Sequence, residues 1–149
     1  MLIIFLTLFL DQVSKALIQM MMYHGESIPV LQPVFYLTYI LNPGAAFGLL
    51  AYQTPLFIAV AILLTVGVLF VYRQLPRDRY LLRSGLALIL GGALGNLTDR
   101  VRHGFVVDFL DFRIWPVFNL ADMAIVAGAC LLVWELLKGD EKQQRNESE

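Results

Sequence analysis

Long apolar stretches separated by short polar segments make up most of the chain and predict helices that cross a membrane. A bilayer core of roughly 30 Å requires about 20 apolar helical residues, because a spanning segment must satisfy its own backbone hydrogen bonds. Four segments meet this requirement, at about residues 2–23, 54–72, 82–98 and 118–137. We therefore predict an all-α membrane protein in which residues 1–138 form a single four-span domain. Residues 139–149 are polar and predict a disordered tail.

The first predicted span carries polar residues at its centre, namely Asp11, Gln12 and Lys15. Each charge costs about 2.5–3.5 kcal/mol at the centre of a spanning helix on the insertion scale. Asp11 and Lys15 stand four residues apart, so on a helix they share a face and can form an ion pair. This pair is either structural or part of a functional site. The segment has no basic start and no small-residue cleavage site before Tyr23, which favours a retained helix over a cleaved leader.

The distribution of Lys and Arg predicts the orientation in the membrane. The loop between spans two and three and the segment after span four are basic, whereas residues 24–52 contain neither Lys nor Arg. The positive-inside rule then places both termini in the cytoplasm and the other two connections outside. In the first outward connection, residues 29–41 are rich in β-branched and aromatic residues and end at the turn sequence Asn42-Pro43-Gly44. This composition predicts a small extended or β element on the outer surface.

Composition supports the membrane class and excludes several others. Of the 149 residues, 58% are hydrophobic and 15% are charged, and the mean hydropathy is +0.69. A soluble domain carries about 25% charged residues. The net charge is −1 and no basic block stands away from a predicted membrane boundary, so we expect no nucleic-acid partner. The single cysteine, Cys130, excludes an internal disulfide.

Polar residues also gather at the end of the third span. Gly91, Gly92 and Gly95 are small enough to allow close approach of a neighbouring helix. Asn96 can donate a hydrogen bond across such an interface, and Arg100 can hold a carboxylate or a lipid phosphate with its planar fork. An ordinary salt bridge at the membrane boundary explains Arg100 equally well.

Two acidic sites around the second outward connection are the main candidates for chemistry. Asn119 followed by Asp122 is typical of a helix N-cap, which explains Asp122 alone. It does not explain Asp108, which lies in an apolar run where an isolated carboxylate is costly. Two carboxyls close together in a poorly hydrated site share a proton and can activate water, which is aspartic peptidase chemistry. Asp111 is an alternative to Asp108, and we find no metal-ligand set and no serine or cysteine nucleophile in a suitable context.

Five ordered motifs resemble the lipoprotein signal peptidases, also called signal peptidase II. They are Asp11-Gln12-x-x-Lys15, Asn42-x-Gly44-Ala45-Ala46-Phe47-Gly48, Gly91-Gly92-Ala93-x-Gly95-Asn96-x-x-Asp99-Arg100, Val107-Asp108-Phe109 and Phe118-Asn119-x-Ala121-Asp122. The resemblance implies that Asp108 and Asp122 form the catalytic dyad. It implies supporting or substrate-binding roles for Asp11, Lys15, Asn42, Gly44, Asn96, Arg100 and Asn119, with no metal and no cofactor.

The resemblance also implies a substrate and a location. The substrate would be a prolipoprotein, cut just before a cysteine that carries a diacylglyceryl group. The enzyme would be a multi-pass monomer of the bacterial inner membrane, in contact with membrane lipids, with its active site at the outer face. Two other classes remain as alternatives: a proton-coupled transporter that uses the intramembrane charges as a relay, and a non-catalytic scaffold that uses them as helix interfaces. A transporter would require acids spread through the membrane depth, whereas the acids after Asp11 cluster at one face.

Overall fold

Residues 1–44 and 53–147, which the computed structural model describes, form four helices and three strands. The helices are α1 (Leu2–Met21), α2 (Thr54–Gln74), α3 (Tyr80–His103) and α4 (Leu120–Glu147), and the strands are β1 (Ser27–Leu31), β2 (Phe35–Asn42) and β3 (Val106–Asp111). Each helix contains a stretch long and apolar enough to cross a membrane. The predicted fold class, four spanning helices with a small β element, is therefore confirmed.

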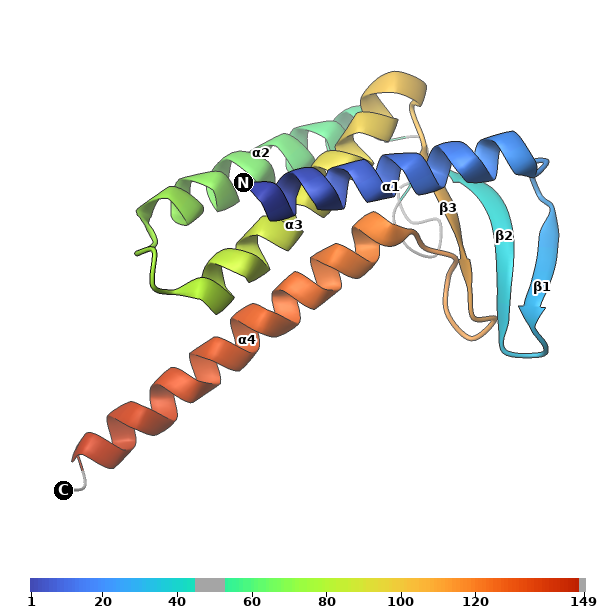
Figure 1. Cartoon of the computed structure of the whole chain (residues 1–149). Coiled ribbons are helices and arrows are strands. Elements are labelled where there is room, and N and C mark those ends of the chain that lie inside the picture. The colour runs from blue at the N-terminus through green and yellow to red at the C-terminus, as the bar shows by residue number, and fades with distance from the viewer. Residues whose placement is uncertain (45–52, 148–149) are drawn as a thin grey trace.

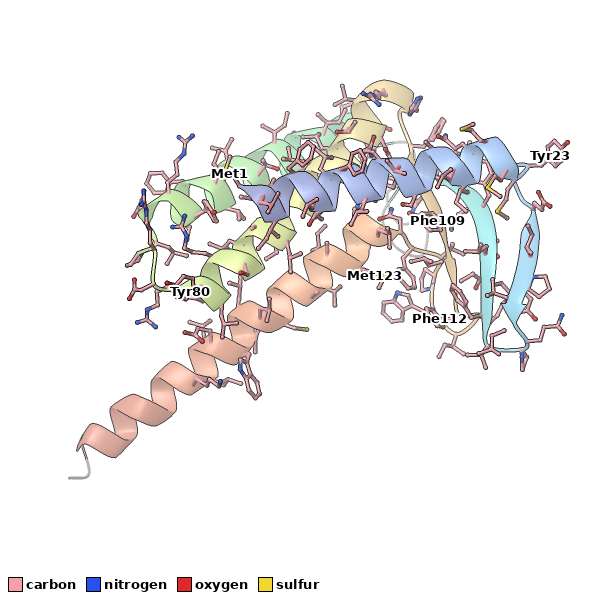
Figure 2. All side chains as sticks on the ribbon, viewed as in Figure 1. Met1, Tyr23, Tyr80, Phe109, Phe112 and Met123 are labelled. Carbon is pink, nitrogen blue, oxygen red and sulfur yellow. The ribbon has the colours of Figure 1, made fainter. Side chains whose placement is uncertain are left out.

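Helix α3 occupies the centre of the bundle and packs against α1, α2 and α4. The three strands form a sheet at one end of the bundle, whereas the first residues and the connection between α2 and α3 lie at the opposite end (Figure 1). Large apolar side chains such as Phe5, Leu63 and Phe70 are more than half exposed. Figure 2 shows side chains projecting outward along the helices. Such an apolar exterior suits contact with lipid rather than water.

The sheet is antiparallel, with β2 between β1 and β3. The single extended element predicted for residues 29–41 is a hairpin, because a turn that contains Pro33 separates β1 from β2. The third strand was not predicted. It pairs with β2 so that Ile40 lies opposite Asp108. This pairing attaches one candidate catalytic residue to the outward hairpin.

Two helices are longer than the sequence pattern predicts. Helix α3 continues past Thr98 to His103 and ends at Gly104, whose positive φ of 83° terminates the helix in the left-handed conformation. Helix α4 continues to Glu147, into the segment for which the composition predicts a polar tail. This extension is rich in Glu, Lys, Gln and Arg, which have good intrinsic helix propensity.

Glycines bring α3 into close contact with its neighbours. A β-carbon at Gly92 would collide with the backbone carbonyl oxygen of Ala121 in α4, and one at Gly95 would collide with the carboxylate of Asp11 in α1. The absence of a side chain at these positions lets α3 approach both helices closely. This close approach sets the distance between Asn96, which directly follows Gly95 in α3, and the start of α4.

Gly92→Ala should therefore lower the thermal unfolding midpoint in detergent and reduce activity. The new methyl group meets rigid backbone rather than a flexible side chain, and such overpacking costs about 1–3 kcal/mol. Gly67→Ala in α2 is the matched control, because a β-carbon there meets no atom within 4 Å. The control should leave the midpoint unchanged or raise it, since Ala favours a helix over Gly by up to about 1 kcal/mol. Equal midpoints for the two variants would contradict the packing argument.

Candidate active site

Asp108 lies on β3 with only 2% of its surface exposed. The side-chain amide of Asn119 donates a hydrogen bond of 2.6 Å to its Oδ1, and that of Asn42 donates one of 2.9 Å to its Oδ2. Asn42 ends β2, the neighbouring strand, and its own Oδ1 accepts a hydrogen bond from the backbone nitrogen of Gly44. Two amide groups from different segments therefore hold the Asp108 carboxyl in one orientation.

Asp122 lies in the first turn of α4 and forms a reciprocal capping arrangement with Asn119. The backbone nitrogen of Asp122 donates to Asn119 Oδ1 at 3.0 Å, and the backbone nitrogen of Asn119 donates to Asp122 Oδ2 at 3.2 Å. This confirms the predicted N-cap. Because the Asn119 side-chain amide also binds Asp108, a single residue contacts both candidate catalytic carboxyls.

Asn96 of α3 holds the other oxygen of Asp122. Its amide nitrogen donates to Asp122 Oδ1 at 2.8 Å, and its own Oδ1 accepts hydrogen bonds from Lys15 at 3.0 Å and from Asn119 at 3.1 Å. These two donors determine which end of the Asn96 amide faces Asp122, since only the nitrogen can donate. A chain of two hydrogen bonds through Asn96 therefore connects Lys15 with Asp122.

The ammonium group of Lys15 is also paired with two carboxylates inside the bundle. Its Nζ lies 2.8 Å from Asp11 Oδ2 and 2.8 Å from Asp99 Oδ2, and all three side chains are buried. The predicted pairing of Asp11 with Lys15 is confirmed. Asp11 also accepts a hydrogen bond from the backbone nitrogen of Ala121, at the start of α4. This network joins α1, α3 and α4 directly behind the site.

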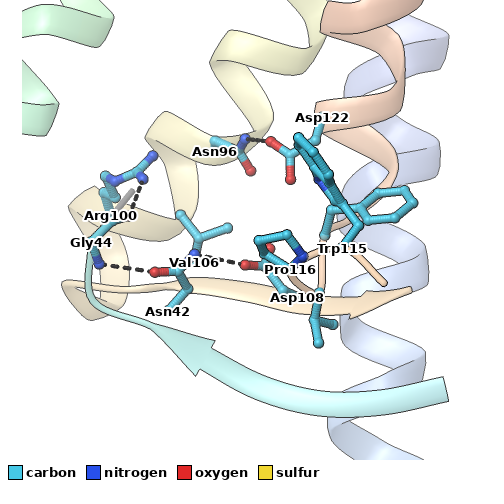
Figure 3. Close-up of a pocket in the computed structure, with 11 residues that line it drawn as sticks. Asn42, Gly44, Asn96, Arg100, Val106, Asp108, Trp115, Pro116 and Asp122 are labelled. Carbon is cyan, nitrogen blue, oxygen red and sulfur yellow. Dashed lines mark hydrogen bonds between the residues drawn. The ribbon is translucent and has the colours of Figure 1, made fainter. Parts of the chain in front are cut away.

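Both carboxyls line one cavity of about 250 Å³ beside the sheet (Figure 3). The lining residues are Asn42, Gly44, Asn96, Arg100, Val106, Asp108, Trp115, Pro116, Val117, Phe118 and Asp122. The Arg100 guanidinium donates to the carbonyl oxygen of Gly44 at 3.1 Å and lies 5.0 Å from the centre of the Phe57 ring. It therefore contributes a positive charge to the cavity wall without a direct ion pair to either carboxyl.

Burial, together with the neighbouring charge of Asp122, raises the pKa of Asp108 to about 7. The amides of Asn42 and Asn119 and the charge of Lys15 oppose this shift. With a pKa of about 7, Asp108 carries its proton in a large share of the molecules at neutral pH.

A second, apolar groove of about 630 Å³ continues from the cavity along α4. It is lined by Phe112, Ile114, Trp115, Phe118, Asp122, Met123, Val126 and Ala127. Trp115, Phe118 and Asp122 line both spaces, so the polar cavity opens onto an apolar path beside the helix. A ligand with a polar reacting group and a long apolar part fits this pair of spaces.

The structure brings most of the predicted site residues together. Six of them line the cavity: Asn42, Gly44, Asn96, Arg100, Asp108 and Asp122. Asn119 is fully buried between the two acids, whereas Asp11 and Lys15 lie behind the cavity rather than in its wall. Residues 45–48 of the second motif lie outside the described residues.

Sequence reasoning missed several contributors to the site. The connection after β3 supplies Trp115, Pro116 and Phe118 to the cavity, and the one available signal was its short aromatic stretch between the two acids. Asp111, the alternative to Asp108, is absent from the cavity lining. It instead accepts a hydrogen bond from Thr38 at 2.7 Å and lies 3.5 Å from the Arg113 guanidinium.

Fold and site together define a multi-pass membrane protein with two aspartates at a cavity on one end of a helical bundle. Residues 3–138 match the family model described as signal peptidase (SPase) II, and the chain belongs to that family of peptidases. A lipoprotein signal peptidase from Pelotomaculum thermopropionicum is 57% identical over 145 residues, which cover 97% of this chain and 95% of the relative. Another from Moorella thermoacetica is also 57% identical over 145 residues and covers 97% of both chains.

Solved structures share the same fold. One bacterial membrane enzyme superimposes with a TM-score of 0.89 at 32% identity, covering 95% of this chain and 88% of the other. A second superimposes with a TM-score of 0.84 at 33% identity, covering 92% of this chain and 91% of the other. The arrangement of helices and sheet is therefore shared with the experimentally determined structures of two bacterial membrane enzymes.

Proposed function

We propose that this chain is an aspartic endopeptidase that removes signal peptides from diacylglyceryl-modified prolipoproteins, cutting just before the lipidated cysteine. The observation that carries this proposal is that Asp108 and Asp122 line one cavity and share Asn119 as a hydrogen-bonding partner. Family membership supports the substrate class, since the relatives are named lipoprotein signal peptidases. The proposed roles need no metal and no cofactor.

The two carboxyls would divide the work of peptide hydrolysis. The ionised Asp122 removes a proton from water as the water oxygen attacks the carbonyl carbon of the scissile bond. Protonated Asp108 donates a hydrogen bond to the carbonyl oxygen, where negative charge develops. When the tetrahedral intermediate collapses, the C–N bond breaks and the proton held by Asp122 passes to the departing amine nitrogen. Asp108 keeps its proton, so the pair returns to its starting state.

The supporting residues would fix the orientation of the two carboxyls. Asn96 and the backbone nitrogen of Asn119 donate to the two oxygens of Asp122 and so hold its carboxyl in place. Lys15 and Asp11 would act by orienting Asn96 and the start of α4, as positioning residues rather than as catalytic ones. Arg100, Asn42 and Gly44 would bind the substrate backbone at the cavity wall.

The apolar groove along α4 suits the remainder of the substrate. A signal peptide and the diacylglyceryl group both arrive from the membrane, and the groove provides apolar walls next to Asp122. The positive-inside rule places the basic loop between α2 and α3 in the cytoplasm. Both termini would then be cytoplasmic and the dyad would lie at the outer face of the inner membrane, where a translocated cleavage site would wait.

Purified protein in detergent should cleave a synthetic prolipoprotein peptide that carries the diacylglyceryl group at the bond before the modified cysteine. Mass spectrometry of the products identifies the bond. The matched control is the same peptide with an unmodified cysteine, which should react far more slowly because it lacks the apolar group that the groove would bind. Addition of EDTA should leave the rate unchanged, because the proposed chemistry uses no metal.

Three results would contradict the proposal. The first is no cleavage of the lipidated peptide by a folded preparation, and the second is cleavage at another bond. The third is loss of activity with EDTA that added metal restores, which would indicate a different reaction class.

A further inference from the structure

A second cavity, with arginine and tyrosine side chains in its wall, lies at the end of the bundle opposite the sheet. It has a volume of about 460 Å³ and is lined by Met1, Ile3, Tyr72, Arg77, Tyr80, Arg83, Ser84 and Ala87. These residues come from the first turn of α1, the last turns of α2, the following loop and the start of α3. Figure 2 shows Met1 and Tyr80 at this end, away from the sheet and from Phe109. The cavity is therefore separate from the candidate active site.

Arg83 is held rigidly at the wall of this cavity. Its Nη1 donates to the carbonyl oxygens of Tyr72 at 3.3 Å and of Leu75 at 2.7 Å, and its guanidinium lies 4.4 Å from the centre of the Tyr72 ring. Within the described part of the chain, its Nη2 and Nε donate to no other residue. A guanidinium fixed through one nitrogen keeps its remaining donors available for an anion.

The cavity also carries uncompensated positive charge. No acidic residue is among the described residues that line it, and Arg77 has no ion-pair partner in the described part of the chain. Arg79 differs, since it lies 3.6 Å from Glu135 of α4. Asp78 is the acid nearest in sequence, and it does not line the cavity. Two arginines thus face a shared space with no protein anion in its lining.

The rest of the lining favours a lipid over a free ion. Ile3 and Ala87 supply apolar surface, whereas Tyr72, Tyr80 and Ser84 supply hydroxyl groups beside the arginines. The cavity lies where α2 ends and α3 begins, at the boundary of two predicted spans. Basic pockets between spanning helices at the membrane boundary bind the head groups of anionic lipids.

We propose that this cavity binds the phosphate of an anionic phospholipid, with Arg77 and Arg83 as the ligands.

Native mass spectrometry of the full chain tests this proposal by counting phospholipids retained during titration with dioleoyl phosphatidylglycerol or dioleoyl phosphatidylcholine. The wild-type chain should retain one phosphatidylglycerol at lower concentration than phosphatidylcholine. Arg77→Gln should weaken retention about fivefold, because each basic residue near an anionic lipid contributes about 1 kcal/mol. Arg83→Gln should weaken it at least as much. If loss of the contacts to α2 unfolds that variant, Arg77→Gln alone decides the result.

Arg73→Gln is the matched control, because it removes an equal charge from the same end of α2 but does not line the cavity. It should retain phosphatidylglycerol as the wild type does. Equal weakening by Arg73→Gln and Arg77→Gln, or equal retention of the two lipids, would overturn the proposal. Displacement of phosphatidylglycerol by an equal concentration of inorganic phosphate would identify a free-anion site instead. None of these readouts depends on cleavage, so failure of the proposed peptidase function would leave them unaffected.

Discussion

The single substitutions Asp108→Asn and Asp122→Asn should each lower the rate of lipidated peptide cleavage by about 1,000-fold. This lies within the range that general acid–base catalysis contributes to reaction rates. Asn at position 122 has nearly the same size as Asp but cannot take up the proton of water. At position 108 the amide nitrogen of Asn would face the side-chain amide of Asn42 or Asn119, which each donate to Asp108, and the acid hydroxyl that stabilises the carbonyl oxygen would be lost. The measurement is the single-turnover cleavage rate of the lipidated peptide. A thermal unfolding midpoint close to that of the wild type shows that each variant is folded.

Asp111→Asn is the matched control for these variants. It makes the same chemical change on the same strand, but its partners are Thr38 and Arg113 outside the cavity. The control should keep most of its activity. The double variant Asp108→Asn/Asp122→Asn should be little worse than either single variant, because residues that act as one unit are strongly non-additive. A folded Asp108→Asn variant with full activity would remove Asp108 from the dyad, and an inactive but folded Asp111→Asn variant would transfer its role to Asp111.

The activity should fall as the pH rises through about 7. Burial and the charge of Asp122 raise the pKa of Asp108 to about 7, so above this pH Asp108 loses the proton that the proposed reaction requires. On the alkaline side, kcat/KM should decrease about tenfold for each pH unit, as expected for loss of a single essential proton. The check is a pH profile of kcat/KM between pH 5 and 9, with the lipidated peptide in the same detergent throughout; a profile that stays flat through this range would exclude a required proton on Asp108.

Thermal stability should decrease as the pH rises from the unfolded pKa of Asp108, 3.8, to its folded value of about 7. The folded-state pKa of Asp108 lies above its unfolded value of 3.8, so the folded protein binds this proton more tightly. This contribution to stability is fully present below the unfolded pKa and is lost as the pH rises through about 7. Asp108→Asn should remove this dependence. Asp122→Asn should move it to lower pH, because it removes a neighbouring charge that raises the Asp108 pKa.

The helices were predictable because the signal for a spanning helix is local. A run of apolar residues such as 54–72 can satisfy its backbone in lipid only as a helix, whatever its neighbours are. The pairing of Asp11 with Lys15 follows from a spacing of four residues, and the cap formed by Asn119 and Asp122 follows from a spacing of three. Each of these features depends on residues close together in the chain.

The features that were missed depend on distant residues. Strand β3 exists because Val106–Asp111 pairs with β2, about 70 residues earlier in the chain, and its own short apolar run does not distinguish a strand from a loop. The division of residues 29–41 into two strands follows from pairing of the hairpin with itself. Likewise, the sequence indicates only that Asp99 belongs to a motif at the end of the third span, whereas the structure places its carboxylate 2.8 Å from the ammonium group of Lys15 in another helix.

By itself, the sequence determined that this chain crosses a membrane as four helices, and its ordered motifs contain six of the residues that line the cavity. Hydrophobic length and short-range spacing carry that information, since they act within a single turn or span. Only the tertiary structure decided that Asn119 contacts both acids, that Asp111 lies outside the cavity, and that an apolar groove joins the cavity beside Asp122. These relations arise where β2, β3 and the ends of α3 and α4 meet, and no single segment contains them.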